Sequence, residues 1–317
     1  MDSGIPAEDA ARSADLTVLD GRIAGCRACP RLVAWREEVA ATKRAAFAGQ
    51  TYWGRPVPGF GPPDASLLVV GLAPAAHGGN RTGRMFTGDR SGDLLYAALH
   101  DIGLASQGTS VSAGDGLELY GVRVTSPVHC APPANKPTPE ERDTCRPWLV
   151  RELGLLRPTL RTVVVLGAFG WQATLPALAE AGWTVPRPRP AFAHGARVTL
   201  ERRPEPDDPG TGVAAGAVSE PWSESSSGPE SSSDSVAASE TGTELASSSA
   251  SASASASASA SASASASASA YGSGSVELFG CFHVSQRNTF TGRLTPAMLR
   301  QVLTTAAESA GLTACSP

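Results

Sequence analysis

The stretch that most constrains the fold is of low complexity and runs from about residue 201 to 275. It consists of Ser, Ala, Gly, Pro and acidic residues and ends in an uninterrupted Ser-Ala alternation up to Ala270. Such a segment buries too little apolar surface to offset the entropy of ordering it, so we expect a disordered insert. A silk-like strand is the alternative, yet Ser and Ala offer little to pack in a single copy. The folded domain is therefore expected to comprise residues 16–200 and 276–317, after a flexible N-terminus at residues 1–15.

Setting the insert aside changes both the size and the charge of the part that folds. About 240 residues remain, which is enough for one α/β domain with a sizeable core. The whole chain has 26 basic and 30 acidic residues and a net charge of −4. Ten of the acids and two of the bases lie in the insert, so the folded part has a net charge of +4. A mildly basic domain is compatible with nucleic acid as a partner but does not establish it.

The chain lacks the signals of membrane or secreted proteins. No apolar run approaches membrane-spanning length, and the N-terminal MDSGIPAEDAARSAD is acidic and polar, unlike a signal peptide. We therefore expect a cytoplasmic monomer that makes no contact with membranes. In that compartment the six cysteines are better explained as ligands or buried thiols than as disulfides.

Four of the cysteines are placed like metal ligands. Cys26 and Cys29 form a CxxC motif, and Cys130 and Cys145 follow about a hundred residues later. A thioredoxin-like redox pair is the alternative for the CxxC motif, but no strand–helix pattern leads into it. The four thiols predict either a zinc site or an iron–sulfur cluster, and their spacing alone does not decide between the two.

Apolar runs alternate with helical patterns along the rest of the chain. Buried strands are expected at residues 66–70, 121–125, 162–166 and 276–282, with an edge strand within residues 192–200. Helices are expected at about residues 31–42, 91–102, 139–156, 170–181 and 296–310. Hydrophobic strands that alternate with helices are typical of an α/β domain with a mainly parallel central sheet flanked by helices.

Residues capable of chemistry follow three of these strands. Asp89 ends the loop GLAPAAHGGNRTGRMFTGD, Asn135 lies in a proline-rich segment, and His283 follows the last strand. Because the carboxyl ends of parallel strands meet at one edge of a sheet, we expect these three side chains at one site. Simpler explanations remain open: Asp89 as the N-cap of the next helix, His283 as a structural histidine, and Phe86 as a core residue. The first loop has neither GxxxxGK[ST] nor GxGxxG, which argues against a nucleotide-phosphate site.

Taken together, the motifs resemble those of the family-5 (type b) uracil-DNA glycosylases, within the uracil-DNA glycosylase superfamily. The resemblance covers nearly the whole chain outside the insert and is carried by CRACPRL, GLAPAAHGGNRTGRMFTGD, CAPPANKPTPEERDTC and HVSQRNTFTGRLTP. It implies the three-layer sandwich of that superfamily in a single domain. It also implies a structural [4Fe–4S] cluster held by Cys26, Cys29, Cys130 and Cys145.

The same resemblance implies an activity. The protein would be a monofunctional DNA glycosylase that flips uracil, or another deaminated base such as hypoxanthine, out of double-stranded DNA. It would hydrolyse the N-glycosidic bond and so initiate base excision repair. Asp89 would orient the attacking water, Asn135 would bind the edge of uracil, and His283 would donate a hydrogen bond to its O2. Phe86 would stack on the flipped base.

The turn after the first strand departs from the pattern of other branches of the superfamily. Those branches place a polar or acidic residue beside the proline of a Gly-x-x-Pro turn, whereas here the turn reads GLAPA. Ala73 and Ala75 cannot activate water, so that task passes to Asp89, while the backbone from Gly71 onward contacts the base. Arg287 and Arg293 would contact DNA phosphates.

The alternative is a non-catalytic iron–sulfur protein that binds nucleic acid or senses redox state on the same scaffold. Retention of Asp89, Asn135 and His283 together argues against it.

Overall fold

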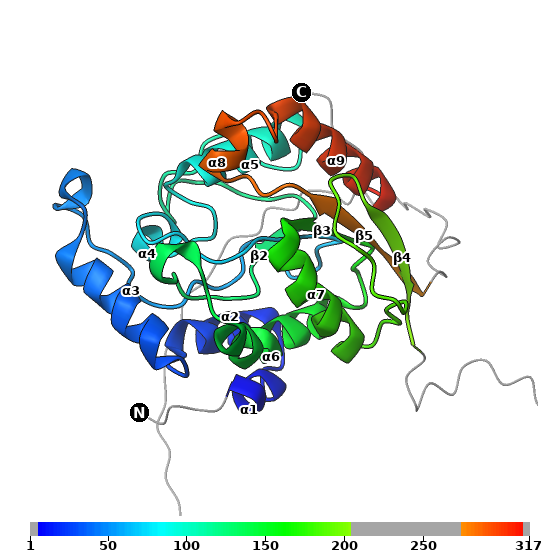
Figure 1. Ribbon diagram of the computed structural model, residues 1–317, viewed down its shortest axis with the longest axis horizontal. Helices are drawn as coiled ribbons and strands as arrows, with labels where there is room; N and C mark the ends of the chain where they lie inside the picture. Colours follow the sequence, from blue (N-terminus) through cyan, green and yellow to red (C-terminus); the bar gives the residue numbers. More distant parts are fainter. Residues whose placement is uncertain (1–5, 204–273, 313–317) are drawn as a thin grey trace, which may run out of the picture. The chain divides into compact units, whose positions relative to one another are not determined.

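The structure is a computed structural model that describes residues 6–203 and 274–312 (Figure 1). Within these residues, five strands form one sheet: β1 (Leu67–Val70), β2 (Val122–Thr125), β3 (Thr162–Leu166), β4 (Arg197–Glu201) and β5 (Ser275–Cys281). Their order in the sheet is β2-β1-β3-β5-β4. All neighbouring pairs are parallel except β4, which runs antiparallel to β5. The expected mainly parallel sheet is therefore confirmed.

Strands β1, β2 and β3 are buried along their whole length, as parallel strands covered on both faces should be. Leu67 of β1 is aligned with Val122 of β2 and with Thr162 of β3. Thr162 is aligned in turn with Glu277 of β5. The parallel strands therefore end at about the same level, which brings the loops that follow them to one edge of the sheet.

Helices cover both faces of the sheet (Figure 1). The described α-helices are α1 (Pro6–Ala11), α2 (Leu16–Gly25), α3 (Pro30–Thr42), α4 (Gly79–Thr82), α5 (Arg90–Asp101), α6 (Pro139–Leu156), α7 (Ala168–Glu180), α8 (Gln286–Phe290) and α9 (Pro296–Ser309). Short 3-10 turns lie at Ala45–Phe47 and Pro133–Asn135. None of the described helices is both long and apolar enough to cross a membrane.

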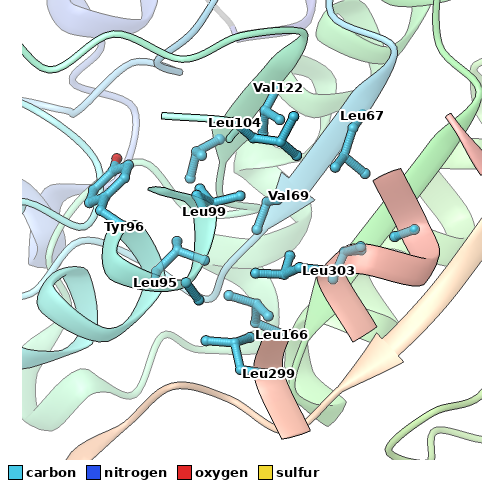
Figure 2. Close-up of a cluster of buried hydrophobic side chains, with 14 of the residues drawn as sticks. Leu67, Val69, Leu95, Tyr96, Leu99, Leu104, Val122, Leu166, Leu299 and Leu303 are labelled. Atoms are coloured by element: carbon cyan, nitrogen blue, oxygen red, sulfur yellow. The ribbon is translucent and has the colours of Figure 1, made fainter. Parts of the chain in front are cut away.

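One face of the sheet is covered by α5 and α9. Figure 2 shows Leu95 and Leu99 of α5 near Val69 of β1, and Leu299 and Leu303 of α9 near Leu166 of β3. These side chains are buried, because α5 presents its apolar residues at the three- and four-residue spacing of one helix face. This packing fixes α5, whose first turn follows Asp89.

The other face is covered by α1, α2, α6 and α7. Leu68 and Val70 of β1 point to this side and pack in one cluster with Trp148 of α6 and Trp171 of α7. Since side chains alternate along a strand, the two faces of β1 supply both cores. The result is the three-layer arrangement expected from the sequence.

The segment that carries the second pair of cysteines begins with a strong helix start signal. Thr138 caps α6: its Oγ1 accepts a hydrogen bond from Glu141 N (3.3 Å), and its own N–H donates to Glu141 Oε2 (2.8 Å). Pro139 occupies the first helical position. This reciprocal capping box fixes the start of α6 and with it the position of Cys145 on the second turn.

The N-terminal part of the chain differs from the expectation of a flexible segment. Residues 6–11 form α1, whose Ala10 is only 2% exposed. Arg22 of α2 donates to the carbonyl of Asp9 (2.7 Å), and Arg151 of α6 donates to that of Ser13 (2.8 Å). Packing against α6 and these bonds to main-chain carbonyls therefore hold a segment whose composition alone gave no sign of order. Residues 1–5 lie outside the described residues.

The expected insert lies almost wholly outside the described residues. Both of its expected limits fall within paired strands, since Glu201 of β4 is aligned with Ser275 of β5. The edge strand is also shorter than expected and occupies only the end of the range 192–200. The insert thus connects two antiparallel neighbours at the margin of the sheet. This is the strand pair farthest from β1 and β2.

Candidate functional site

Four strand ends are joined by main-chain hydrogen bonds at one edge of the sheet. Gly71 N, at the end of β1, donates to Thr125 O at the end of β2 (2.8 Å). Gly167 N, after β3, donates to Cys281 O at the end of β5 (2.8 Å). The loops that contain Asp89, Asn135 and His283 all start from this edge. The parallel direction of the strands, which was expected, places the starts of these three loops at the same edge.

Phe86 and His283, which come from different loops, lie side by side. Their ring centroids are 6.4 Å apart and their planes are inclined by 35°. Phe86 has a φ of +51°, a left-handed conformation that is uncommon for a bulky residue. Its ring lies over Gly71, where an added Cβ would be 2.6 Å from Phe86 Cζ. An aromatic ring and an imidazole therefore form one surface above the end of β1.

Asp89 caps α5 and leaves one carboxylate oxygen unused. Its Oδ1 accepts hydrogen bonds from Ser91 N (2.9 Å) and Gly92 N (3.1 Å). In the part of the chain that the structure describes, Oδ2 accepts no hydrogen bond, and it lies against Gly78, where a Cβ would overlap with it. The capping role considered for Asp89 is thus confirmed, and the second oxygen remains available to a ligand.

Burial shifts the pKa values of the two titratable groups at this edge in opposite directions. Burial raises the pKa of Asp89, while the two backbone N–H groups and the charge of Arg81 oppose that rise. Burial lowers the pKa of His283 to about 4. At neutral pH His283 is therefore a neutral imidazole, and Asp89 is a carboxylate that takes up a proton more readily than an exposed one.

Asn135 lies in the loop that follows β2. It is exposed, and among the described residues no hydrogen bond links it to Asp89 or His283. Both Ala134 and Asn135 have left-handed backbones, with φ of +52° and +55°. Two consecutive non-glycine residues in this region cost about 1–3 kcal/mol each, and such strain is concentrated at functional sites. The loop of Asn135 thus starts from the same edge of the sheet, but no hydrogen bond joins its side chain to the other two residues.

The remaining residues expected to bind substrate are spread around this edge. Ala73 packs beside Cys130 and Leu32, and the carbonyl of Ala75 accepts hydrogen bonds from the main chain of the following turn. Arg287 and Arg293 are exposed on and after α8, and Arg293 lies over the ring of Phe282 (4.5 Å to the centroid). Both arginines are thus free to meet a ligand larger than the loops.

The four expected metal ligands line a single cavity. It lies between α2, α3 and α6, and its wall includes Cys26, Cys29, Cys130 and Cys145 together with Arg36 and His129. Burial raises the pKa of Cys29 to about 11 and that of Cys130 to about 12. These thiols therefore keep their protons at neutral pH unless a metal displaces them.

Two buried nitrogens on the same cavity wall have no hydrogen-bond partner among the described residues. They are Nε of Arg36 and Nε2 of His129. His129 Nδ1 is bonded to Val57 O at 2.7 Å, so in the neutral ring it carries the proton and Nε2 does not. No three His, Cys, Asp or Glu side chains of the described chain surround one point as a single metal ion requires. The four thiols that line the cavity are ligands of the kind that bind zinc or an iron–sulfur cluster.

The comparisons with known proteins agree with this geometry. A family model described as the uracil DNA glycosylase superfamily matches residues 58–208. A type-5 uracil-DNA glycosylase of Mycobacterium tuberculosis is 44% identical over 294 residues, which are 93% of this chain and 81% of that protein. The chain belongs to the type-5 uracil-DNA glycosylases. Two more relatives with the same description are those of Mycobacterium leprae (42% over 294 residues, 93% of this chain and 95% of that one) and Thermus thermophilus (54% over 178 residues, 56% and 78%).

Within this type-5 glycosylase, several neighbours of the site escaped the sequence analysis. Gly78 accommodates the Asp89 carboxylate, and Arg36 and His129 line the cysteine cavity. Arg36 could have been found, because it interrupts the buried stripe of Leu32, Val33 and Val39 on α3 with a charge. Gly78 and His129 left no such signal, since their roles depend on segments that meet only in three dimensions.

Proposed function

We propose that the protein hydrolyses the N-glycosidic bond of uracil in double-stranded DNA, after flipping the nucleotide out of the duplex. The observation that carries this proposal is that the two oxygens of the Asp89 carboxylate differ in their hydrogen-bond partners. Oδ1 is held by the first turn of α5, and Oδ2 has no partner among the described residues. A general base needs a fixed position together with an unused oxygen. The Asp89 side chain meets both needs.

In this mechanism Asp89 acts as a carboxylate. Its free oxygen orients a water molecule toward the anomeric carbon of the flipped nucleotide and stabilises the positive charge that develops on the sugar. Partial burial strengthens both interactions, since electrostatic effects increase as water is excluded. The apolar Ala73 and Ala75 supply no alternative base, so water activation depends on Asp89 alone.

His283 stabilises the leaving group. The departing base carries negative charge on O2. A neutral imidazole can donate a hydrogen bond to that oxygen and remain neutral itself. The low pKa of His283 keeps the ring in this neutral form. Phe86, 6.4 Å from the imidazole, provides the flat surface on which the flipped base stacks.

Asn135 and the main chain at Gly71–Ala75 recognise the base. The side-chain amide of Asn135 offers one donor and one acceptor, which match O4 and N3–H of uracil. Its exposed position and left-handed backbone suit a residue that meets its partner only when the base is flipped in. Arg287 and Arg293 contact phosphates and so position the duplex without reading its sequence.

We assign the four cysteines to a [4Fe–4S] cluster with a structural role. The support is a single cavity lined by all four thiols, with the Nε–H group of Arg36, a donor without a partner among the described residues, on its wall. Such a cluster binds thiolates and accepts hydrogen bonds at its sulfurs. Residues 16–200 and 276–317 form the catalytic domain in this proposal, and residues 201–275 are an insert outside the chemistry. The protein acts as a cytoplasmic monomer at the nucleoid.

The test is a base-excision assay with purified protein. Duplexes that contain one uracil, hypoxanthine or xanthine are incubated with the enzyme, and abasic sites are then cleaved with alkali. We expect strand cleavage of the uracil duplex only after alkali, because a monofunctional enzyme leaves the sugar–phosphate chain intact. Absence of cleavage for every base would contradict the proposal and favour a non-catalytic scaffold.

A further inference from the structure

Arg36 on α3 is a buried cation without a carboxylate partner. Its side chain is 2% exposed, and no ion pair joins it to an acidic residue in the described ranges. Nη1 donates to Cys130 Sγ (2.8 Å) and Nη2 donates to Cys26 O (3.1 Å), while Nε has no partner. Both hydrogen bonds lead to cysteines of the cavity, and the third donor is unused beside it.

An isolated guanidinium in the interior is strongly unfavourable, because it gives up its hydration for too few partners. Every other buried arginine of the described chain finds more: Arg84 pairs with Asp115, Arg123 pairs with Asp20 and Glu152, and Arg81 bonds to Gln50 and two carbonyls. Among these buried arginines, only Arg36 donates to a thiol, whereas Arg84 and Arg123 donate to carboxylates. The missing anion is therefore expected in the cavity itself.

We propose that Arg36 is the counter-ion of the cluster: its guanidinium binds the Cys130 thiolate and thereby sets both the retention and the reduction potential of the iron–sulfur group. This role rests on the cluster assigned above. A cluster bound by four thiolates carries a net negative charge, which balances the guanidinium. Hydrogen bonds and positive charge at the sulfurs stabilise the reduced state and raise the potential.

The same residue connects the cavity to the catalytic loop. The carbonyl of Arg36 accepts a hydrogen bond from Asn80 Nδ2 (3.2 Å), and Asn80 is fully buried on α4. Asn80 N in turn donates to Ala75 O (3.1 Å), within the loop that ends at Asp89. Arg36 is thus a positioning residue: it touches neither the base nor the water, yet its main chain anchors the loop that carries the catalytic carboxylate.

The experiment compares the wild-type protein with Arg36→Met, which removes charge and donors at similar volume, and with Arg36→Lys, which keeps the charge. Arg27→Met is the matched control, because Arg27 is exposed beside Cys26 and pairs with Glu37. Iron content, the rate of bleaching near 400 nm (roughly the range of iron–sulfur absorption) in the presence of a chelator, and the midpoint potential are measured. We expect Arg36→Met to weaken iron retention by about 10- to 100-fold, as loss of an outer-shell partner does, and to lower the potential. For Arg36→Lys we expect iron retention and a midpoint potential between those of the wild type and Arg36→Met. For Arg27→Met we expect both quantities to equal those of the wild type.

A midpoint potential in Arg36→Met equal to that of the wild type would overturn the proposal, because packing alone does not set a potential. If Arg36→Met fails to fold, Arg36→Lys and Arg36→Gln replace it, and equal potentials in these two would likewise exclude a charge effect. Wild-type protein that excises uracil but contains no iron would refute the cluster and this role while leaving the glycosylase assignment intact. Failure of the Arg36 comparison in iron-loaded protein refutes this role alone.

Discussion

The strand-end loops and the cysteine cavity differ in what holds their functional groups. Asp89, Phe86 and His283 stand at the ends of parallel strands, where backbone hydrogen bonds join neighbouring loops and leave side chains open to a ligand. Cys130 and Cys145 belong to the wall of a cavity enclosed by helices, beside a buried cation. Polar atoms without hydrogen-bond partners among the described residues lie at the edge of the sheet in the strand-end loops and in the interior in the cysteine cavity.

Because of this difference, we expect the strand-end residues to determine turnover and the cavity residues to determine stability. In the proposed mechanism Asp89 Oδ2, which has no partner among the described residues, changes its partner in every catalytic cycle. A buried set of thiols with Arg36 needs its partner permanently, since an uncompensated charge in the interior destabilises the fold. Substitutions at the strand ends are thus expected to change turnover at constant stability, and substitutions in the cavity are expected to do the reverse.

The largest effect is expected from Asp89→Asn. Asparagine caps helices about as well as aspartate, so the first turn of α5 remains satisfied while the base is lost. We expect turnover on a uracil duplex to fall about 10²- to 10⁴-fold, with an unchanged melting temperature and unchanged DNA binding. Single-turnover kinetics and thermal unfolding measure the two quantities on the same sample.

Asp93→Asn is the matched control for that change. Asp93 lies one turn further along α5, is exposed, and loses the same charge. Wild-type turnover is expected for it. An Asp89→Asn variant that retains full turnover would remove Asp89 from the mechanism, and one that melts at a much lower temperature would show that capping and catalysis are not separable here.

His283 is expected to give the next largest effect. His283→Phe keeps a ring against Phe86 but removes the donor, so we expect a loss of about 10²- to 10³-fold in turnover, the usual cost of one preorganised donor to a developing anion. His283→Gln retains an N–H group and should recover part of that loss. Equal rates for the two variants would show that the ring packs but does not donate.

Several parts of this site could be predicted from sequence because their causes are local. The helix cap at Asp89 and the capping box of Thr138 and Glu141 follow from residue types at fixed spacing. The expectation of parallel strands placed the loops of Asp89 and His283 at one edge of the sheet. Helices α1, α2, α4 and α8 were missed, since α1 and α2 are held by contacts with α6, and α4 and α8 have only four and five residues.

Other parts depend on contacts between distant segments. The left-handed backbone of Phe86 is possible because Gly71 leaves room for its ring, a fact that neither residue reveals alone. The meeting of Cys26 with Cys130 was implied by resemblance to relatives rather than by spacing. Arg36 was absent from the expected site, because its partner is a thiol more than ninety residues away.

The pH dependence of the wild-type enzyme gives a smaller effect. Asp89 acts as a carboxylate, and burial raises its pKa above the ordinary value of 3.8, so kcat/KM should fall about tenfold per pH unit once the pH drops below that raised pKa. His283, with a pKa of about 4, takes up a proton only near that pH and adds a second loss there. A rate profile from pH 4 to 8 measures this limb. In Asp89→Asn the limb should disappear, and its persistence there would assign it to another group.

The smallest effect on turnover is expected from Cys145→Ser, in the cavity. Loss of one ligand should release the iron and lower the free energy of unfolding by about 3 kcal/mol, the stabilisation provided by a ligand present at about 100 times its Kd. Turnover per folded molecule should fall less than about tenfold, because no group that touches the base is lost. Iron analysis, denaturant unfolding and active-site titration measure the three quantities.

Cys281→Ser makes the same change at another fully buried thiol, on β5 and outside the cavity, so it controls for burying a hydroxyl group. It should keep its iron and show only the cost of one altered core side chain. If Cys145→Ser lost turnover as severely as Asp89→Asn while remaining folded, the separation of the two regions would fail. The connection through Arg36 and Asn80 would then transmit the state of the cavity to Asp89 far more strongly than one hydrogen bond between a side-chain amide and a carbonyl suggests.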